Sequence, residues 1–186
     1  LIDCDKIAIL ISARKTGYGD IVKFDTSCDN CDTDMELDIS LTKMLEESLS
    51  STPERTAAPD WKYLEDSNTY SFELPTTKLN VQIKLLTAED TNHLEASKQQ
   101  KQKLGLPYNE TVEFLRACIV QAQGVVDRTS INKLAEILPA ADARKIRVVH
   151  NENMPKVKTT TTVHCNSCGH ENKKEVPFSL GWFWLD

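Results

Sequence analysis

The sequence predicts an α+β fold in which two β-hairpins, far apart along the 186-residue chain, form a split zinc ribbon. A β-hairpin and several helices are expected as an insert between them. The first supporting observation is a pair of C-x-x-C motifs, Cys28/Cys31 and Cys165/Cys168. The second is that alternating apolar residues, typical of short strands, flank both motifs. Two such turns supply the four sulfur ligands that tetrahedral Zn²⁺ prefers.

Length and composition indicate a folded protein with one sizeable core and room for a small satellite. The net charge of −6 disfavours sequence-independent binding to nucleic acid, which needs clustered Lys and Arg side chains. No apolar run approaches the roughly 20 residues needed to cross a bilayer. No export signal is visible beside the six cysteines, so zinc in a reducing compartment explains the C-x-x-C pairs better than disulfides do.

The chain before the first hairpin is expected to be helical. Ile7, Leu10 and Ile11 recur at helical spacing, which predicts a helix over residues 3–16 that Gly17 ends.

Three segments are expected along the chain. Residues 1–44 and 156–186 are assigned to this helix and the two zinc hairpins. Residues 45–67 contain prolines and many polar residues, and they are predicted to be a surface excursion. Residues 68–155 are predicted to form the insert.

The insert is predicted to begin with a hairpin, because apolar and polar residues alternate over 70–74 and again over 79–85. A capping box at Thr87 predicts a polar helix that runs to about Lys103. Three further helices are expected, with tight breaks between them. Their predicted bounds run from the Asn109 cap to Gly124, from Ser130 to Pro139, and from Ala140 to about His150.

The second zinc hairpin is expected to have strands over 160–163 and 176–180. A group of large apolar residues follows it, which is unusual because terminal residues commonly fray in water. Such side chains are expected to be buried in this protein's own core or in a pocket of a partner, since aromatic anchors are favoured at interfaces. The candidate partner-binding residues are Trp182, Phe183, Trp184 and Leu185.

The cysteines of the two motifs are the predicted metal ligands. His164 or His170 is able to replace a sulfur, but the simpler interpretation leaves both beside the site or at the surface. A redox role is the weaker alternative, because thioredoxin-type pairs begin a helix whereas these pairs lie in hairpin turns. Four thiolates also leave no open position on the metal for catalysis. Cys4 and Cys118 lie on apolar helical faces and are interpreted as small buried hydrophobes.

Several segments carry a family resemblance. In chain order they are RKTGYGD (14–20), FELP (72–75), LLT (85–87), LPAADAR (138–144), CNSCGHE (165–171), VPF (176–178) and WFW (182–184). In this combination, which spans most of the chain except residues 45–67, the sequence resembles the baseplate hub proteins of contractile-tailed, T-even type bacteriophages.

The resemblance implies a non-enzymatic hub component or hub assembly factor: a zinc-stapled scaffold that docks baseplate hub and tape-measure-type tail proteins, with self-association as a further option. It implies the host cytoplasm during assembly, or the virion tail baseplate, as the location. The alternative is a cytoplasmic zinc-ribbon adaptor of a nucleic-acid-processing complex. Acidic residues around the first cysteine pair, including Asp29, Asp32 and Asp34, weigh against that alternative. A metallohydrolase or thiol oxidoreductase ranks last.

Overall fold

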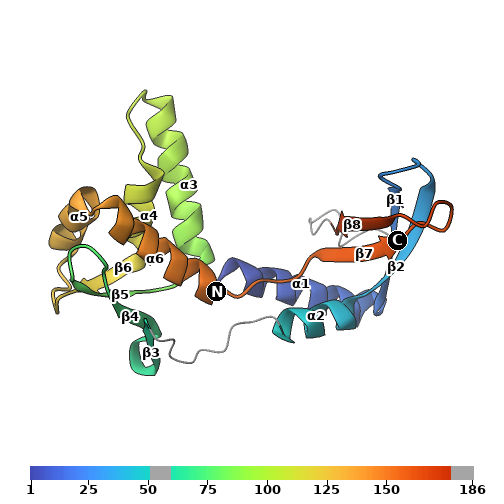
Figure 1. Cartoon of the computed structure of the whole chain (residues 1–186), viewed down its shortest axis with the longest axis horizontal. Helices are drawn as coiled ribbons and strands as arrows, with labels where there is room; N and C mark the ends of the chain where they lie inside the picture. The colour runs from blue at the N-terminus through green and yellow to red at the C-terminus, as the bar shows by residue number, and fades with distance from the viewer. Residues whose placement is uncertain (51–59, 177–186) are drawn as a thin grey trace. The chain divides into compact units, whose positions relative to one another are not determined.

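The structure is a computed structural model, and it describes residues 1–50 and 60–176. The predicted α+β class is confirmed, because helices and antiparallel hairpins occur in both of its compact units (Figure 1). The central unit comprises Leu1–Ile2 and Pro53–Met154. The hairpin unit comprises Asp3–Thr52 and Pro155–Asp186, so the chain leaves it and later returns.

Over residues 3–50 and 155–176, the hairpin unit contains two helices and two separate two-stranded antiparallel sheets. Its elements are α1 (Asp3–Tyr18), β1 (Ile21–Ser27), β2 (Asp34–Ser40), α2 (Leu41–Ser50), β7 (Thr160–His164) and β8 (Glu171–Glu175). β1 pairs with β2, and β7 pairs with β8. The small core draws buried residues from α1, β1, β2, α2 and the end of the second hairpin: Ile11, Val22, Ile39, Leu41, Met44 and Val176.

Helix α1 agrees with the predicted helix but ends later. It continues through Gly17 to Tyr18, and the chain turns at Gly19, whose φ of +99° suits glycine. The Gly19 N–H donates to the Lys15 carbonyl at 3.0 Å, which satisfies one carbonyl of the last turn.

Helix α2 corrects the prediction for residues 45–67, which were expected to be a surface excursion. Its residues Leu41 and Met44 are buried at helical spacing. The capping group comes from the preceding hairpin: the Thr42 N–H donates to Asp20 Oδ1 at 2.8 Å, and the Ser40 hydroxyl donates to Asp20 Oδ2 at 2.7 Å. Ser40 also caps the helix locally, because the Lys43 N–H donates to its Oγ at 3.2 Å. The contact from Asp20, 22 residues before Thr42, is the part that the local sequence does not show.

The second hairpin also differs in register from the prediction. Strand β8 begins at Glu171, directly after the turn, and not at residue 176. It pairs Asn172 with Val163, and the Val176 N–H extends the ladder by donating to the Thr159 carbonyl at 2.9 Å. The sequence ENKKE is polar and lacks the apolar alternation that predicts a strand. Pairing with β7 sets the position of this strand instead.

In the described part of the central unit, four helices pack with a four-stranded antiparallel sheet of order β3-β4-β5-β6 (Figure 1). Its elements are β3 (Lys62–Leu64), the 3₁₀ turn η1 (Glu65–Ser67), β4 (Thr69–Glu73), β5 (Asn80–Ile83), α3 (Ala88–Lys103), α4 (Glu110–Cys118), β6 (Ile119–Ala122), α5 (Arg128–Ile137) and α6 (Ala140–Asn153). The core joins sheet residues such as Tyr70 and Ile83 to helix residues such as Leu115, Ile131 and Ile146.

Two predicted helix caps of the central unit are confirmed. Thr87 and Asp90 form the reciprocal capping box of α3, and the Asn109 side chain accepts from the Val112 N–H at the start of α4. Helix α5 begins at Arg128, ahead of the predicted Ser130, because the Asp127 carboxylate accepts from the Ser130 N–H at 2.8 Å.

Strand β6 corrects the prediction of one helix from Asn109 to Gly124. The helix ends at Cys118, and Ile119 and Ala122 pair with Ile83 and Val81 of β5. Ile119 and its neighbour Val120 are β-branched, which suits a strand. The apolar spacing of this segment fits a helix as well, so the sheet edge offered by β5 decides the conformation.

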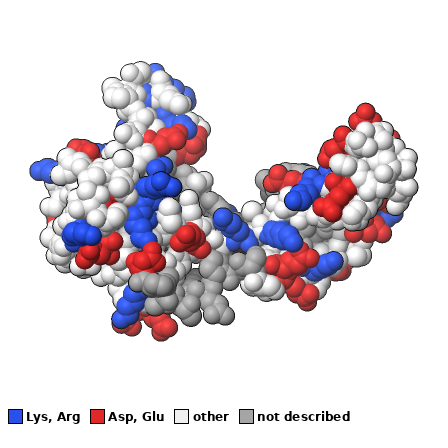
Figure 2. Space-filling model, in the orientation of Figure 1, with Lys and Arg blue, Asp and Glu red and all other residues white. Residues whose placement is uncertain are grey.

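Acidic and basic side chains are interspersed on the face shown in Figure 2. Within residues 1–50 and 60–176, no helix is both long and apolar enough to cross a membrane.

Candidate metal centre

The first cysteine pair lies in the tight turn between β1 and β2. The Cys28 N–H donates to the Thr33 carbonyl at 2.9 Å, and the Asp32 N–H donates to the Cys28 carbonyl at 3.0 Å. Asp32 adopts a left-handed conformation with φ of +54°, which aspartate tolerates better than most residues.

The second pair repeats this turn between β7 and β8. The Cys165 N–H donates to the His170 carbonyl, and the Gly169 N–H donates to the Cys165 carbonyl, both at 2.9 Å. Gly169 has φ of +71° and takes the place of Asp32. The two turns therefore share one backbone pattern, although 140 positions separate Cys28 from Cys168.

Backbone donors point at the first sulfur of each turn. The Asn30 N–H lies 3.5 Å from Cys28 Sγ, and the Ser167 N–H lies 3.4 Å from Cys165 Sγ. Such donors stabilise the thiolate, which is the form of cysteine that binds metal. Each turn is thus arranged to present a thiolate toward the other.

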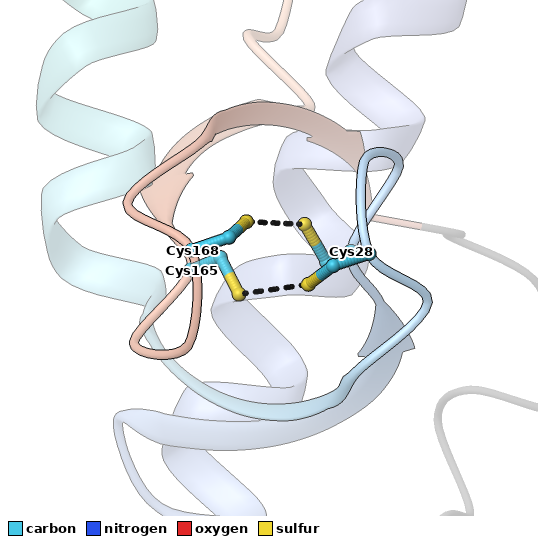
Figure 3. Close-up of side chains that lie close together, drawn as sticks. Cys28, Cys165 and Cys168 are labelled. Atoms are coloured by element: carbon cyan, nitrogen blue, oxygen red, sulfur yellow. Dashed lines mark hydrogen bonds between the residues drawn. The ribbon is translucent and has the colours of Figure 1, made fainter.

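The four sulfurs converge between the two hairpins (Figure 3). Cys28 Sγ lies 3.7 Å from Cys168 Sγ, and Cys31 Sγ lies 3.7 Å from Cys165 Sγ. All four Sγ atoms lie within 4.8 Å of one another. A tetrahedral Zn²⁺ with Zn–S bonds of about 2.3 Å places its sulfurs about 3.8 Å apart. The donor set and its spacing therefore fit a tetrahedral metal ion.

Asn172 of β8 joins the two turns and was missed by the sequence analysis. Its Oδ1 accepts from the Asp29 N–H at 2.8 Å, while its Nδ2 lies 3.6 Å from Cys28 Sγ and 3.0 Å from the His170 carbonyl. The side chain is only 1% exposed. Lys174, two residues further along β8, forms an ion pair with the Asp29 carboxylate. An asparagine within the polar sequence ENKKE carries no local signal for this role, because its partner Asp29 lies in the other hairpin.

The pKa values of the sulfurs are unequal. The Asn30 N–H is the main cause that lowers the pKa of Cys28 to about 6, and the Thr33 hydroxyl is the main cause that lowers the pKa of Cys31. The backbone of His170 acts to lower the pKa of Cys168, but the sulfurs of Cys31 and Cys28 and burial outweigh it and raise that pKa to about 11. Neighbouring sulfurs oppose each other's ionisation, so four thiolates here require a cation.

The other predicted residues that the structure describes are not part of this group of sulfurs. His164 and His170 are exposed, and the group of candidate ligands among the described residues contains the four cysteines without either histidine. Cys118 is fully buried, as predicted, and burial raises its pKa to about 12. Cys4 is half-buried in α1. The candidate partner-binding residues Trp182, Phe183, Trp184 and Leu185 lie outside the described residues.

Comparison with known proteins places these features in a family. The family model described as "T4 bacteriophage base plate protein" matches residues 1–183. No curated protein and no solved structure matches the chain. The match covers both cysteine turns and the whole central unit. The chain therefore belongs to the family of T4 bacteriophage base plate proteins, whose role in the phage tail is structural and involves other tail proteins.

Proposed function

We propose that this protein is a non-enzymatic component of the phage baseplate hub, or a factor that assembles the hub. In this proposal, Cys28, Cys31, Cys165 and Cys168 hold one structural Zn²⁺ that staples the two hairpins into a split zinc ribbon. The convergence of the four sulfurs within 4.8 Å is the observation that carries the proposal. The family supplies its setting in the phage tail.

The energy of zinc binding is sufficient for such a staple. Closing a flexible loop of this length costs on the order of 5 kcal/mol of chain entropy, because the cost grows only with the logarithm of length. Structural Zn²⁺ in small peptides contributes about 10–16 kcal/mol. The difference favours a closed hairpin unit even though the central unit is inserted between its two halves.

The surroundings of the sulfurs favour a structural metal over a catalytic one. Four sulfur ligands fill the tetrahedral coordination and leave no position for water or substrate. The groups next to the sulfurs are backbone N–H donors, the Thr33 hydroxyl and the amides of Asn30 and Asn172. These groups stabilise thiolates and do not act as general bases.

The proposed partners are baseplate hub and tape-measure-type tail proteins. Trp182, Phe183, Trp184 and Leu185 are the proposed anchors, because aromatic side chains supply much of the binding energy at protein interfaces. The proposal places the protein in the host cytoplasm during assembly and in the virion baseplate if it remains in the finished tail.

Co-purification with hub and tape-measure-type proteins tests this function. The full chain should be captured with a tail protein and give a defined complex in native mass spectrometry. A chain that stops after Leu180 should keep its metal and its fold but lose most of this association. If the full chain forms no complex with any hub or tape-measure-type protein, the hub role is wrong.

The adaptor alternative makes a different prediction. The outward face of the β1–β2 hairpin carries Asp25, Asp34, Glu36 and Asp38, and it would repel phosphate groups. Among the described residues, Lys and Arg are interspersed with Asp and Glu on the face seen in Figure 2. Binding to RNA or DNA that weakens steeply with salt would favour the adaptor over the baseplate scaffold.

A further inference from the structure

The sulfur contacts of the metal centre pair the hairpins in a specific way. Cys28, the first cysteine of its turn, lies 3.7 Å from Cys168, the second cysteine of the other turn. Cys31 and Cys165 form the equivalent contact at 3.7 Å. Figure 3 shows both contacts running from one hairpin to the other. Both turns have the same geometry, so each hairpin offers an inner sulfur at its first cysteine and an outer sulfur at its second. Each contact therefore joins the inner sulfur of one hairpin to the outer sulfur of the other.

We propose that the four cysteines are also a peroxide-sensitive modification site, at which oxidation joins Cys28 to Cys168 and Cys31 to Cys165. The inference rests on the same four residues as the proposed zinc staple and adds a second chemical state to them. A disulfide has an S–S bond of about 2.05 Å, so each pair needs an approach of about 1.7 Å between its sulfurs. Rotation of the side chains supplies part of this movement, and the backbone turns keep their hydrogen bonds.

The unequal exposure of the sulfurs gives the oxidation an order. Cys31 and Cys168, one sulfur of each contact, are exposed, whereas their partners Cys165 and Cys28 are buried. A peroxide therefore reaches the exposed sulfur of each pair first; at Cys168 it oxidises the thiol to sulfenic acid, and one molecule of water is released. The Cys28 thiol then attacks this sulfur, the S–S bond forms, and the sulfenic hydroxyl leaves with the thiol proton as a second water. Each disulfide thus consumes one peroxide and two thiols and yields two waters.

The product holds the hairpins together without a metal. A disulfide has no thiolate charge with which to bind a divalent cation, so the oxidised cysteines lose the metal. The two bonds nevertheless join residues that are 140 and 134 positions apart, and so they close the same part of the chain. The hairpin unit is then expected to keep its fold in either state.

Peptide mapping of the oxidised full chain tests the pairing. The zinc-loaded protein is treated with hydrogen peroxide and digested with trypsin, which releases residues 24–43 and residues 159–173 as separate peptides. The proposed disulfides link these two peptides until a reductant is added. Disulfides between Cys28 and Cys31, and between Cys165 and Cys168, would leave the peptides separate and overturn the proposal.

A matched pair of double variants distinguishes the two possible cross-pairings. C31S/C165S retains Cys28 and Cys168, which are in contact, whereas C31S/C168S retains Cys28 and Cys165. The first variant should form its disulfide at least tenfold faster with peroxide, and equal rates would contradict the proposed pairing. The mapping of the wild-type chain decides the same point if either variant fails to fold.

Metal analysis separates this proposal from the zinc staple. Before oxidation, the reduced protein should contain one Zn²⁺ per chain, and after oxidation it should contain none and unfold at a temperature that EDTA no longer changes. If the reduced protein binds zinc but oxidation forms disulfides inside each turn, the zinc staple is supported and the proposed oxidation site is wrong. Cross-linked cysteines in a protein that never binds zinc would support the oxidation site and overturn the staple.

Discussion

Cys28 and Cys4 belong to the same unit, but their surroundings give them different roles. Cys28 is fully buried, accepts from the Asn30 N–H and lies 3.7 Å from Cys168, whereas Cys4 is half-buried on α1 beside Asp5. Cys28→Ser or Cys168→Ser should therefore release the metal and lower the unfolding temperature by more than about 10 °C. Cys4→Ser, the matched control, should shift it by about 2 °C or less. Equal and mild effects in thermal unfolding with metal analysis would contradict the staple.

Asn172 supports the sulfur site from β8, since it accepts from the Asp29 N–H and donates toward Cys28 Sγ. Asn172→Ala should leave the Asp29 N–H without this acceptor and cost about 1–3 kcal/mol. Removing such a supporting hydrogen bond should also weaken zinc affinity about 10–100-fold. Competition with a chromogenic chelator measures the affinity. Asn166→Ala, at an exposed position of the same hairpin, is the control and should leave it unchanged.

Asp142 fixes the turn between β4 and β5 in the central unit. Its fully buried carboxylate accepts from the N–H groups of Thr76 and Thr77 at 2.7 and 3.0 Å. Burial alone would raise the pKa of Asp142, but these donors outweigh it and lower that pKa. Asp142→Ala should cost about 2–4 kcal/mol, because two backbone donors lose their partner. Urea unfolding near pH 7 measures the loss.

The lowered pKa of Asp142 fixes the sign of the pH dependence. The ionised carboxylate stabilises the fold at pH values above the unfolded-state pKa of about 3.9, and this stabilisation is lost as pH falls through the lower folded-state pKa. The difference in stability between wild type and Asp142→Ala should therefore shrink in acid. A difference that stays constant from pH 7 to pH 2 would show that the charge is not the cause.

At the scale of elements, α2 depends on a residue of the preceding hairpin. The Asp20 carboxylate accepts from the Thr42 N–H and from the hydroxyls of Thr42 and Ser40. Asp20→Ala should remove these three hydrogen bonds, while the Ser40 Oγ still accepts from the Lys43 N–H, and lower the unfolding temperature of the hairpin unit by roughly 3–6 °C. Asp20→Asn keeps an acceptor oxygen and should restore most of it. Circular dichroism during heating measures both variants, and an unchanged Asp20→Ala midpoint would contradict the capping role.

The elements that the sequence revealed are those whose signal is local. The capping box at Thr87 needs only Asp90, three residues away, and alternation over residues 70–74 suffices for β4. Strand β6 was not recognised, because Ile119 and Ala122 also fit helical spacing and their pairing partner is β5. The position of β8 was missed for the same reason: its register depends on β7 and not on its own apolar pattern.

The metal centre shows the same division between local and distant signals. The C-x-x-C spacing identifies the four cysteines, because each turn is encoded within a few residues. Asn172 could not be assigned from the sequence, since its partner Asp29 lies 143 positions away. The unequal pKa values of Cys28 and Cys168 likewise arise from contacts between the hairpins.

At the scale of the whole molecule, one unit is formed almost entirely by a single stretch of chain and the other by two long stretches. The central unit has its own core, built almost entirely from one stretch that includes Tyr70, Leu115 and Ile146. The hairpin unit is built from two stretches, and its buried cluster combines Ile11 with Val176. Only the hairpin unit contains the sulfur cluster, so the two units are expected to respond differently to removal of the metal.

Hydrogen exchange measured by mass spectrometry tests this difference directly. After treatment with a chelator, peptides from β1, β2, β7 and β8 should lose most of their protection, because the proposed staple no longer opposes the entropy of the inserted loop. Peptides from β4, β5 and α4 should stay protected, since the sulfur site contributes nothing to their core. Added Zn²⁺ should restore the first group within the same experiment. If both groups lose protection together, the two units unfold as one, and if neither does, the metal does not hold the hairpins.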